Sequence, residues 1–466
     1  MTAESDRRQD PTVYRIRRDT GSNSIQKGRT AGEKYMLLKK KQEKKYYLGI
    51  DLQEKFCQIS WISKDRLRMT PTGRRTWDPV TFSMTAGRED YNIPACICRG
   101  EDGRWLTGRE AMAFAAARGM EPVTGLLRLA ALGETVRIGE EDCDPVTLLS
   151  VYLRRCLQLL SAQVDPEDIE SIVFTVPSPD RQIVEALDGV LERLQLPVEN
   201  ISYQGHMECL FDYVLAQQEQ QRRLGVILCE NDGGSDLLLG ELIFNYKTKP
   251  AISMPRIRHF ELTPGASAAV RDRQLLDALR QMDFGTGGAA VYLIGDGFKG
   301  RWMQESLRFI GQGRRVFQGG NLYSRGAAFG ALFKSGMVKG LGDYFYLAED
   351  CLRMNIGVEA VRAGKDCYHA LLDAGTKWYD AVLSEEFLLE SGNEIELVLT
   401  PLNGGGRRTE TILLRGLPER PPGTTRIRLT LTMDRAEAVS YRVEDLGFGA
   451  IFPSSGQQWT GEVNVI

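Results

Sequence analysis

Two segments of the chain follow one pattern: a buried strand that ends in an acidic residue, a tight turn, and a second strand. The first segment is 46–62, with Asp51 before a polar turn at 53–55, and the second is 225–244, with Glu230 before a glycine-rich turn. Such a turn lets backbone N–H groups approach a phosphate while the acid holds its metal ion through water. The first segment alone fits equally well an ordinary hairpin with one solvated acid. Two such hairpins about 180 residues apart predict a duplicated domain with a cleft between its halves.

Strands and helices alternate between the two hairpins. The continuous apolar run at 171–177 predicts a strand that is covered on both faces. The spacing of apolar residues predicts helices at 145–162, 180–195 and 206–221, with a short strand at 200–203. Alternation of this kind predicts a parallel α/β sheet covered by helices.

The character of the sequence changes after residue 338. Residues 339–349 are predicted to be a linker, after which turns recur at short spacing through 350–466. Alternating strands lie between those turns, for example at 394–399 and 426–432. This pattern is typical of an all-β sandwich. With 466 residues in total, two or three domains are expected, and we assign 46–338 to the α/β domain.

Composition excludes several classes of protein. There is no run of 18 apolar residues and no secretory signal pattern, so we expect no membrane span and a cytoplasmic protein. The nine cysteines show no zinc-ligand spacing, which favours reduced, buried thiols. The three histidines fit no metal-binding or triad-like pattern, so serine or cysteine hydrolase chemistry has little support.

The N-terminal segment 1–45 is basic, with 13 lysines and arginines against 6 acids. We expect a solvated, disordered arm, although such an arm can also touch nucleic acid or anionic lipid. Of these, nucleic acid is an unlikely partner. A third interpretation is that translation starts at Met36, because Gly32-Glu33-Lys34 can be encoded by a purine-rich stretch like a bacterial ribosome-binding site.

The order of these segments resembles the seventy-kilodalton heat-shock chaperones (the DnaK-like class), within the actin and sugar-kinase superfamily. The resemblance implies an α/β actin-like (ribonuclease-H-like, duplicated) nucleotide domain followed by a C-terminal all-β sandwich that resembles their substrate-binding domain. The individual matches are loose, and their order carries the resemblance. The resembling segments are Gly49-Ile50-Asp51-Leu52, Ile93-Pro94-Ala95, 105–111, Phe174-Thr175-Val176-Pro177, 201–204, 230–235, 293–297, 321–332, 355–359 and 417–424.

This resemblance implies ATP or ADP with Mg²⁺ as cofactors and gives individual residues a role. Asp51, with Glu230 or Asp232, would hold Mg²⁺ through water. Gln204 stands where relatives orient the attacking water, and Arg128 stands near a lysine that reaches phosphate. The positions implied to line the nucleotide site are Gly49, Gln53, Lys55, Asp232, Gly233, Gly234, Ser235, Gly295, Asp296 and Gly297.

Departures from the family pattern weaken the implied chemistry. The first turn is Gln53-Glu54-Lys55 where the family has glycine and threonines. The carboxylate of Glu54, at ~4 Å from a phosphate, would be repelled by about 4 kcal/mol at an effective dielectric of about 20. The charge of Lys55 would offset this repulsion in part. Only about 60 residues separate the second phosphate turn from the adenosine turn at 293–297, which is short for the family. Because the chain stops at Ile466, just after the sandwich, we expect no helical lid.

Three outcomes therefore stay open for the α/β domain: ATP hydrolysis, nucleotide binding with little turnover, or no nucleotide. The main hypothesis is a bacterial-type, chaperone-like, ATP-binding protein whose lidless sandwich binds an extended peptide or unfolded segment. The alternative is a non-enzymatic scaffold or adaptor that binds protein partners through a degenerate nucleotide fold. An actin-like filament former is disfavoured by the attached sandwich. Aromatic residues offer either peptide-binding surface or ordinary packing: Tyr344, Phe345, Tyr346, Trp378 and Tyr379.

Overall fold

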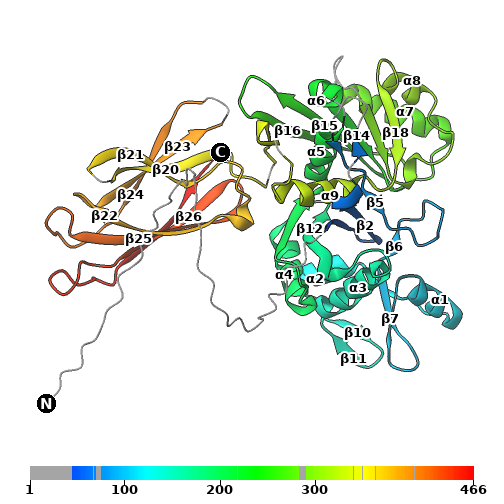
Figure 1. Ribbon diagram of the computed structural model, residues 1–466, viewed down its shortest axis with the longest axis horizontal. Coiled ribbons are helices and arrows are strands. Elements are labelled where there is room, and N and C mark those ends of the chain that lie inside the picture. The colour runs from blue at the N-terminus through cyan, green and yellow to red at the C-terminus, as the bar shows by residue number, and fades with distance from the viewer. Residues whose placement is uncertain are drawn as a thin grey trace, which may run out of the picture. The chain divides into compact units, whose positions relative to one another are not determined.

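Strand β1 (Tyr46–Leu52) lies in the middle of the first large sheet of the computed structural model (Figure 1). The described residues are 45–466 apart from 67, 70–74, 218, 283–289, 339–340, 349, 363, 403–404 and 466. The predicted basic arm 1–45, except for Lys45, and the predicted start at Met36 thus lie outside the described residues.

The first sheet has the spatial order β13-β12-β1-β2-β5, with β6 also paired to β2. β1 runs antiparallel to β2 and parallel to β12, which runs parallel to β13. The hairpin predicted at 46–62 and the strands predicted at 171–177 and 200–203 are confirmed. The further strands are β2 (Phe56–Ser63), β5 (Val80–Thr81), β6 (Ile93–Pro94), β12 (Ile169–Val176) and β13 (Asn200–Gly205).

The second large sheet repeats this arrangement, in the order β18-β17-β14-β15-β16-β19. Its hairpin, β14 and β15, is antiparallel, and β17 and β18 follow in parallel on the other side of β14. The hairpin predicted at 225–244 is confirmed. The strands are β14 (Val226–Glu230), β15 (Asp236–Asn245), β16 (Ala251–Glu261), β17 (Ala290–Ile294), β18 (Arg315–Gly319) and β19 (Tyr344–Tyr346).

Helices cover the sheets in layers. Leu48 and Ile50 of β1 pack with α2, α3 and α4, whereas Tyr47 on its other face packs with α5 and α9. The same central core reaches Leu228 of the second sheet, whose far face packs against α7 and α8. α5 and α9 therefore lie between the two sheets (Figure 1). The helices are α2 (Leu126–Leu132), α3 (Pro145–Leu160), α4 (Arg181–Leu194), α5 (His206–Ala216), α7 (Ala268–Met282), α8 (Glu305–Ile310) and α9 (Leu322–Lys334).

Local sequence explains where the helices begin. The side chain of Asp144 accepts a hydrogen bond from Thr147 N at 2.9 Å, and Pro145 occupies the first turn of α3.

The predicted helix 206–221 is divided in two, because α5 ends at Ala216 and α6 (Glu219–Leu224) follows. Smaller elements complete this part: α1 (Gly108–Arg118), β3 (Arg68–Met69), β4 (Arg75–Thr76), β7 (Cys96–Arg99), β8 (Trp105–Thr107), β9 (Val123–Thr124), β10 (Val136–Ile138) and β11 (Glu141–Cys143).

Part of the predicted linker has regular structure. Residues Tyr344–Tyr346 form β19, which pairs in parallel with Ala251–Ser253 of β16 and so extends the second sheet. A short 3₁₀ helix at Leu341–Asp343 precedes it.

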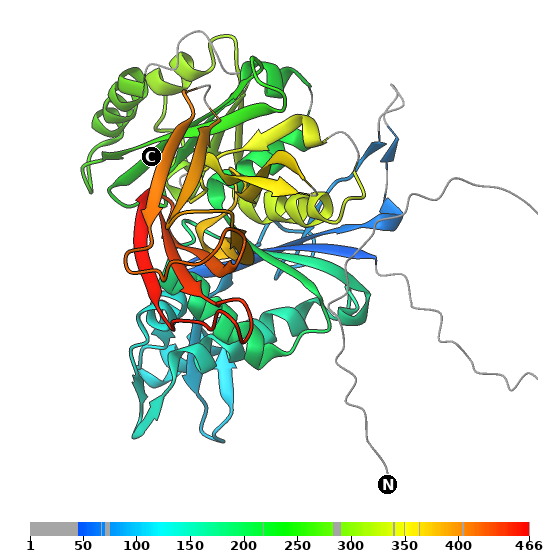
Figure 2. The ribbon, with the colours of Figure 1, turned by 90° about the vertical axis from the view of Figure 1, so that its left-hand side faces the viewer.

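The C-terminal part contains two four-stranded sheets, ordered β21-β20-β23-β24 and β22-β25-β26-β27. Residues of both sheets share one apolar core, including Ile356, Leu397, Leu429 and Val443. The strands of the second of these sheets are orange to red in Figure 2. Their bounds are β20 (Met354–Arg362), β21 (Lys365–Leu372), β22 (Val382–Leu389), β23 (Glu394–Pro401), β24 (Arg408–Leu413), β25 (Thr425–Arg435), β26 (Ala438–Asp445) and β27 (Gln458–Asn464).

Candidate functional site

Asp51, the acid of the first hairpin, is held by protein groups on both oxygens. It is 1% exposed near the end of β1. His206 Nε2, at the first residue of α5, lies 2.9 Å from Asp51 Oδ1, and Gln53 Nε2 donates to Oδ2 at 2.8 Å. The carboxylate is thus satisfied inside the protein.

The His206 ring also connects Asp51 to the second hairpin. It stacks on Tyr323 of α9, with ring centroids 3.7 Å apart. The Tyr323 hydroxyl donates to Glu230 Oε2 at 2.5 Å. Burial opposes the charged form of His206, but Asp51 and then Glu230 and Asp232 outweigh it and raise the pKa of His206. The acids of the two hairpins are therefore joined through a stacked pair of rings.

The pKa of Glu230 is shifted as well. Burial raises the pKa of Glu230, against the opposing effects of His206 and of the Tyr323 hydrogen bond. Both hairpin acids thus depend on the same two rings.

The second turn is organised by Asn231, which is 2% exposed. Its Nδ2 donates to Gly234 O at 3.1 Å, and its Oδ1 accepts from Gly233 N at 3.1 Å and from Arg271 Nη2 at 2.8 Å. A Cβ at Gly295 would lie 2.4 Å from Asn231 O, so this glycine is needed for the close contact between the two turns.

A cleft of about 750 Å³ opens beside these turns, and a smaller hollow of about 290 Å³ shares Lys55, Glu230, Asp232 and Tyr323 with it. The larger volume is in the range of ligand sites, and the smaller one is at the lower limit of that range. Of the residues predicted from the sequence, the larger cleft is lined by Gln53, Lys55, Glu230, Asp232, Gly295 and Asp296, and the smaller hollow also by Gly234.

Other predicted positions have structural partners. Gly49 faces α9, where an added Cβ would come 2.2 Å from Ser324 O. The backbone N–H of Gly297 donates to Asn231 O at 2.8 Å, and the backbone oxygen of Ser235 accepts from Leu262 N. Arg128 is not among the residues that line either hollow; its Nε lies 3.9 Å from Glu54 Oε2.

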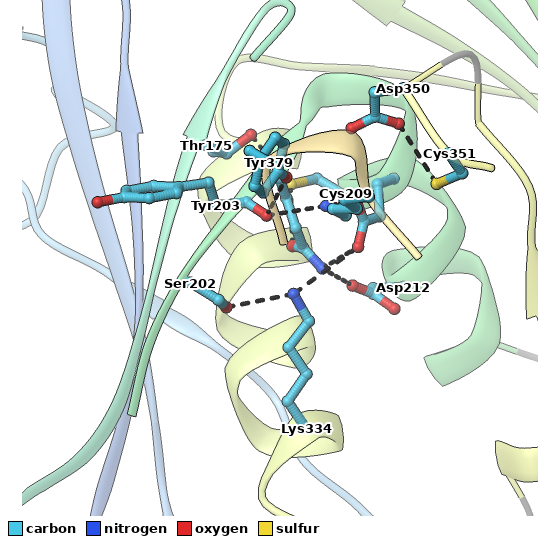
Figure 3. A network of polar contacts seen from close by, with 12 residues as sticks. Thr175, Ser202, Tyr203, Cys209, Asp212, Lys334, Asp350, Cys351 and Tyr379 are labelled. Carbon is cyan, nitrogen blue, oxygen red and sulfur yellow. Dashed lines mark hydrogen bonds and ion pairs between the residues drawn. The ribbon is translucent and has the colours of Figure 1, made fainter. Parts of the chain in front are cut away.

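Gln204 bonds to Asp212 and so belongs to a different polar network, in which Figure 3 labels Asp212 and Lys334. Its side chain is 1% exposed and donates to Glu208 Oε1 at 2.9 Å and to Asp212 Oδ2 at 2.8 Å. Lys377 of the C-terminal part donates to Glu208 Oε2 at 2.5 Å and to Tyr203 O at 2.9 Å. Gln204 is not among the residues lining the cleft, so the structure does not bring it together with the cleft groups.

Charge is distributed unevenly in this network. Burial raises the pKa of Glu208, but Lys377 and Lys334 outweigh burial and leave it lowered. Burial, followed by the charge of Glu208, raises the pKa of Asp212 to about 7. Lys334 also donates to Ser202 Oγ at 3.2 Å (Figure 3).

Two family models match the chain. Residues 78–349, more than half of the chain, match the model described as "Family of unknown function (DUF5716) C-terminal". The chain belongs to the DUF5716 family. Residues 351–465 match the model described as "Domain of unknown function (DUF8552)". No curated protein matches this DUF5716 chain.

The acids of the two hairpins in this DUF5716 chain do not fit Mg²⁺. Both oxygens of Asp51 already accept hydrogen bonds, and one oxygen of Glu230 is taken by Tyr323. Within the described part of the chain, no three His, Cys, Asp or Glu side chains are grouped to hold a metal ion. Mg²⁺ requires near-ideal octahedral oxygen ligands or bound waters, and this arrangement offers no such set.

Sequence reasoning missed four residues of the site: His206, Tyr323, Asn231 and Arg271. His206 directly follows a predicted strand and begins a helix, the place where α/β folds put functional side chains, which was the available signal. Tyr323 carried no comparable signal, since its partners are far away in the sequence.

None of the helices in the described ranges has the length and apolar character that a membrane crossing needs.

Proposed function

We propose that this DUF5716 chain is a binding protein or scaffold built on a nucleotide-binding fold, and that it does not turn over ATP. One observation supports this proposal above others. Asp51 and Gln204, the residues that would hold metal and orient water, are both buried and use their side chains in hydrogen bonds to other protein groups.

The actin-like fold is part of the proposal. It is supported by the two large sheets, since each has an antiparallel hairpin followed by two parallel strands on the other side. The cleft beside both hairpin turns is the site where this fold would take a ligand.

Energetics disfavours recovery of a metal site. Each hydrogen bond to a charged group contributes about 1.5–3 kcal/mol. Releasing Asp51 from both His206 and Gln53 therefore costs about 3–6 kcal/mol before any metal is bound. Binding of metal and nucleotide would have to supply that free energy first.

A second candidate is the chaperone-like protein, with ATP or ADP and Mg²⁺ as cofactors and an extended peptide as partner. Its support comes from β22, which lies at the edge of its sheet and exposes Val382 by 71% and Leu388 by 54%. An edge strand with apolar side chains can take up a peptide by strand addition. A panel of fluorescent extended peptides tests this candidate, and absence of binding across the panel removes it.

A cytoplasmic location is proposed for either candidate. All nine cysteines are free thiols and seven of them are buried, which fits a reducing compartment.

The test of the main proposal is phosphate release by the full chain with ATP and Mg²⁺. We expect the same background rate for the wild-type protein and for Asp51→Ala. Release well above background in the wild-type protein, lost in Asp51→Ala and kept in the exposed control Glu192→Gln, would refute the proposal.

A further inference from the structure

We infer that the cleft of this protein works without a divalent metal ion, because His206 takes the position at Asp51 that such an ion would need. This inference deepens the proposed function and rests on it. It concerns His206, the residue that occupies the position beside Asp51 where a metal ion would bind.

Position is the first reason. Asp51 lies near the end of β1, the leading strand of the first hairpin, and Glu230 lies at the end of β14, the leading strand of the second hairpin. A metal ion between the hairpins would have to contact these acids or their water shell. The space between them is instead crossed by the His206 ring, 2.9 Å from Asp51, and the Tyr323 ring stacked on it.

Burial is the second reason. His206 and Tyr323 are 5% and 2% exposed, and Asp51 is 1% exposed. His206 and Tyr323 line the smaller hollow and Asp51 lines neither hollow, so a hydrated ion cannot reach Asp51 unless the rings move. Tyr323 is held in turn by its bond to Glu230.

Charge near the cleft is the third reason. Asp296 is paired with Lys299 at 2.8 Å, and Asp90 with Arg109 at 2.5 Å. Glu89 and Asp232 add negative charge to the lining, where Lys55 adds positive charge. A polyphosphate without a metal would meet this negative wall, so the cleft favours a ligand with few or no phosphates.

The test is Mn²⁺ binding to the full chain without nucleotide, measured from the electron paramagnetic resonance signal of free Mn²⁺. Mn²⁺ bound elsewhere is subtracted with Asp51→Asn in each background. His206→Gln keeps a side-chain N–H of similar reach, so we expect neither the wild-type protein nor His206→Gln to bind an Asp51-dependent ion. His206→Ala removes the donor and opens space, and we expect it to gain one Asp51-dependent Mn²⁺.

Two results would overturn the inference. One is a wild-type protein that binds an Mn²⁺ ion lost in Asp51→Asn, a comparison that stands even if His206→Ala does not fold. The other is a folded His206→Ala protein that gains no ion, which would show that His206 is not the closing group. Because no nucleotide is present, ATP turnover would refute the proposed function without deciding this measurement.

Discussion

The carboxyl group of Asp212 in α5 is buried, and its surroundings oppose its charged form. Burial and the neighbouring Glu208 raise its pKa from 3.8 to about 7. In the unfolded chain the carboxyl loses its proton near its ordinary pKa, whereas in the folded protein it keeps the proton until about pH 7. Between these values the folded state binds more protons, so this residue lowers the free energy of unfolding as pH rises, and the full penalty is present above about pH 7.

The size of this penalty follows from the shift in pKa. About three pKa units at about 1.4 kcal/mol each give about 4 kcal/mol as an upper value. Asp212→Asn removes the charge but keeps an oxygen that can accept the 2.8 Å hydrogen bond from Gln204 Nε2. We therefore expect the variant to be more stable than the wild-type protein by up to about 4 kcal/mol at mildly alkaline pH, with the gain shrinking toward acid.

Urea unfolding of the two proteins at several pH values, followed by tryptophan fluorescence, measures this difference. Glu192→Gln on the exposed face of α4 is the matched control, since it also removes one carboxylate. A variant that is less stable by the same amount at every pH would contradict the reasoning, because it would mean that folding does not shift the pKa of Asp212. A loss of stability that grows as pH rises would contradict it too, because it would mean that the charged form is stabilised in the folded protein.

Two further substitutions test packing by the same unfolding measurement. Lys377→Met removes the 2.5 Å partner of Glu208, whose side chain is only 12% exposed and would keep Lys334 at 3.7 Å. This substitution should cost about 3–5 kcal/mol, whereas the exposed control Lys365→Met should change stability by less than about 0.5 kcal/mol; equal effects would show that the ion pair is unimportant. Gly49→Ala places a Cβ 2.2 Å from a carbonyl oxygen of α9 and should lower stability by about 1–3 kcal/mol or more. The control Gly342→Ala enters open space, and a Gly49→Ala protein with its stability intact would mean that α9 can move away.

Much of the α/β fold could be predicted from the sequence, because the signals of its strands and helices are local. The apolar run at 171–177 and the capped, regularly spaced helix beginning at Pro145 need no distant partner to be read. Strand β16 (Ala251–Glu261) was not predicted, since it carries Pro255 and charged side chains on an exposed face.

The candidate site could be predicted only in part, because its key contacts are remote in sequence. The positions of Asp51 and Glu230 at strand ends follow from local pattern, but the Asp51–His206 contact joins residues 155 positions apart. Gln204 is different, because its partners Glu208 and Asp212 are close in sequence and lie in α5, the helix that directly follows its strand.

The packing of β1 against α9 has a consequence for biosynthesis. The packing around β1 is incomplete until α9 has been made. This helix contacts Gly49, and its Ser324 bonds to Ser60 at 2.8 Å. At roughly 5–20 residues per second, the ribosome needs on the order of tens of seconds to proceed from one to the other. During that interval the face of the first sheet that carries Tyr47 lacks its cover by α9. A factor that shields nascent chains would thus have its longest opportunity to act before residue 334 emerges.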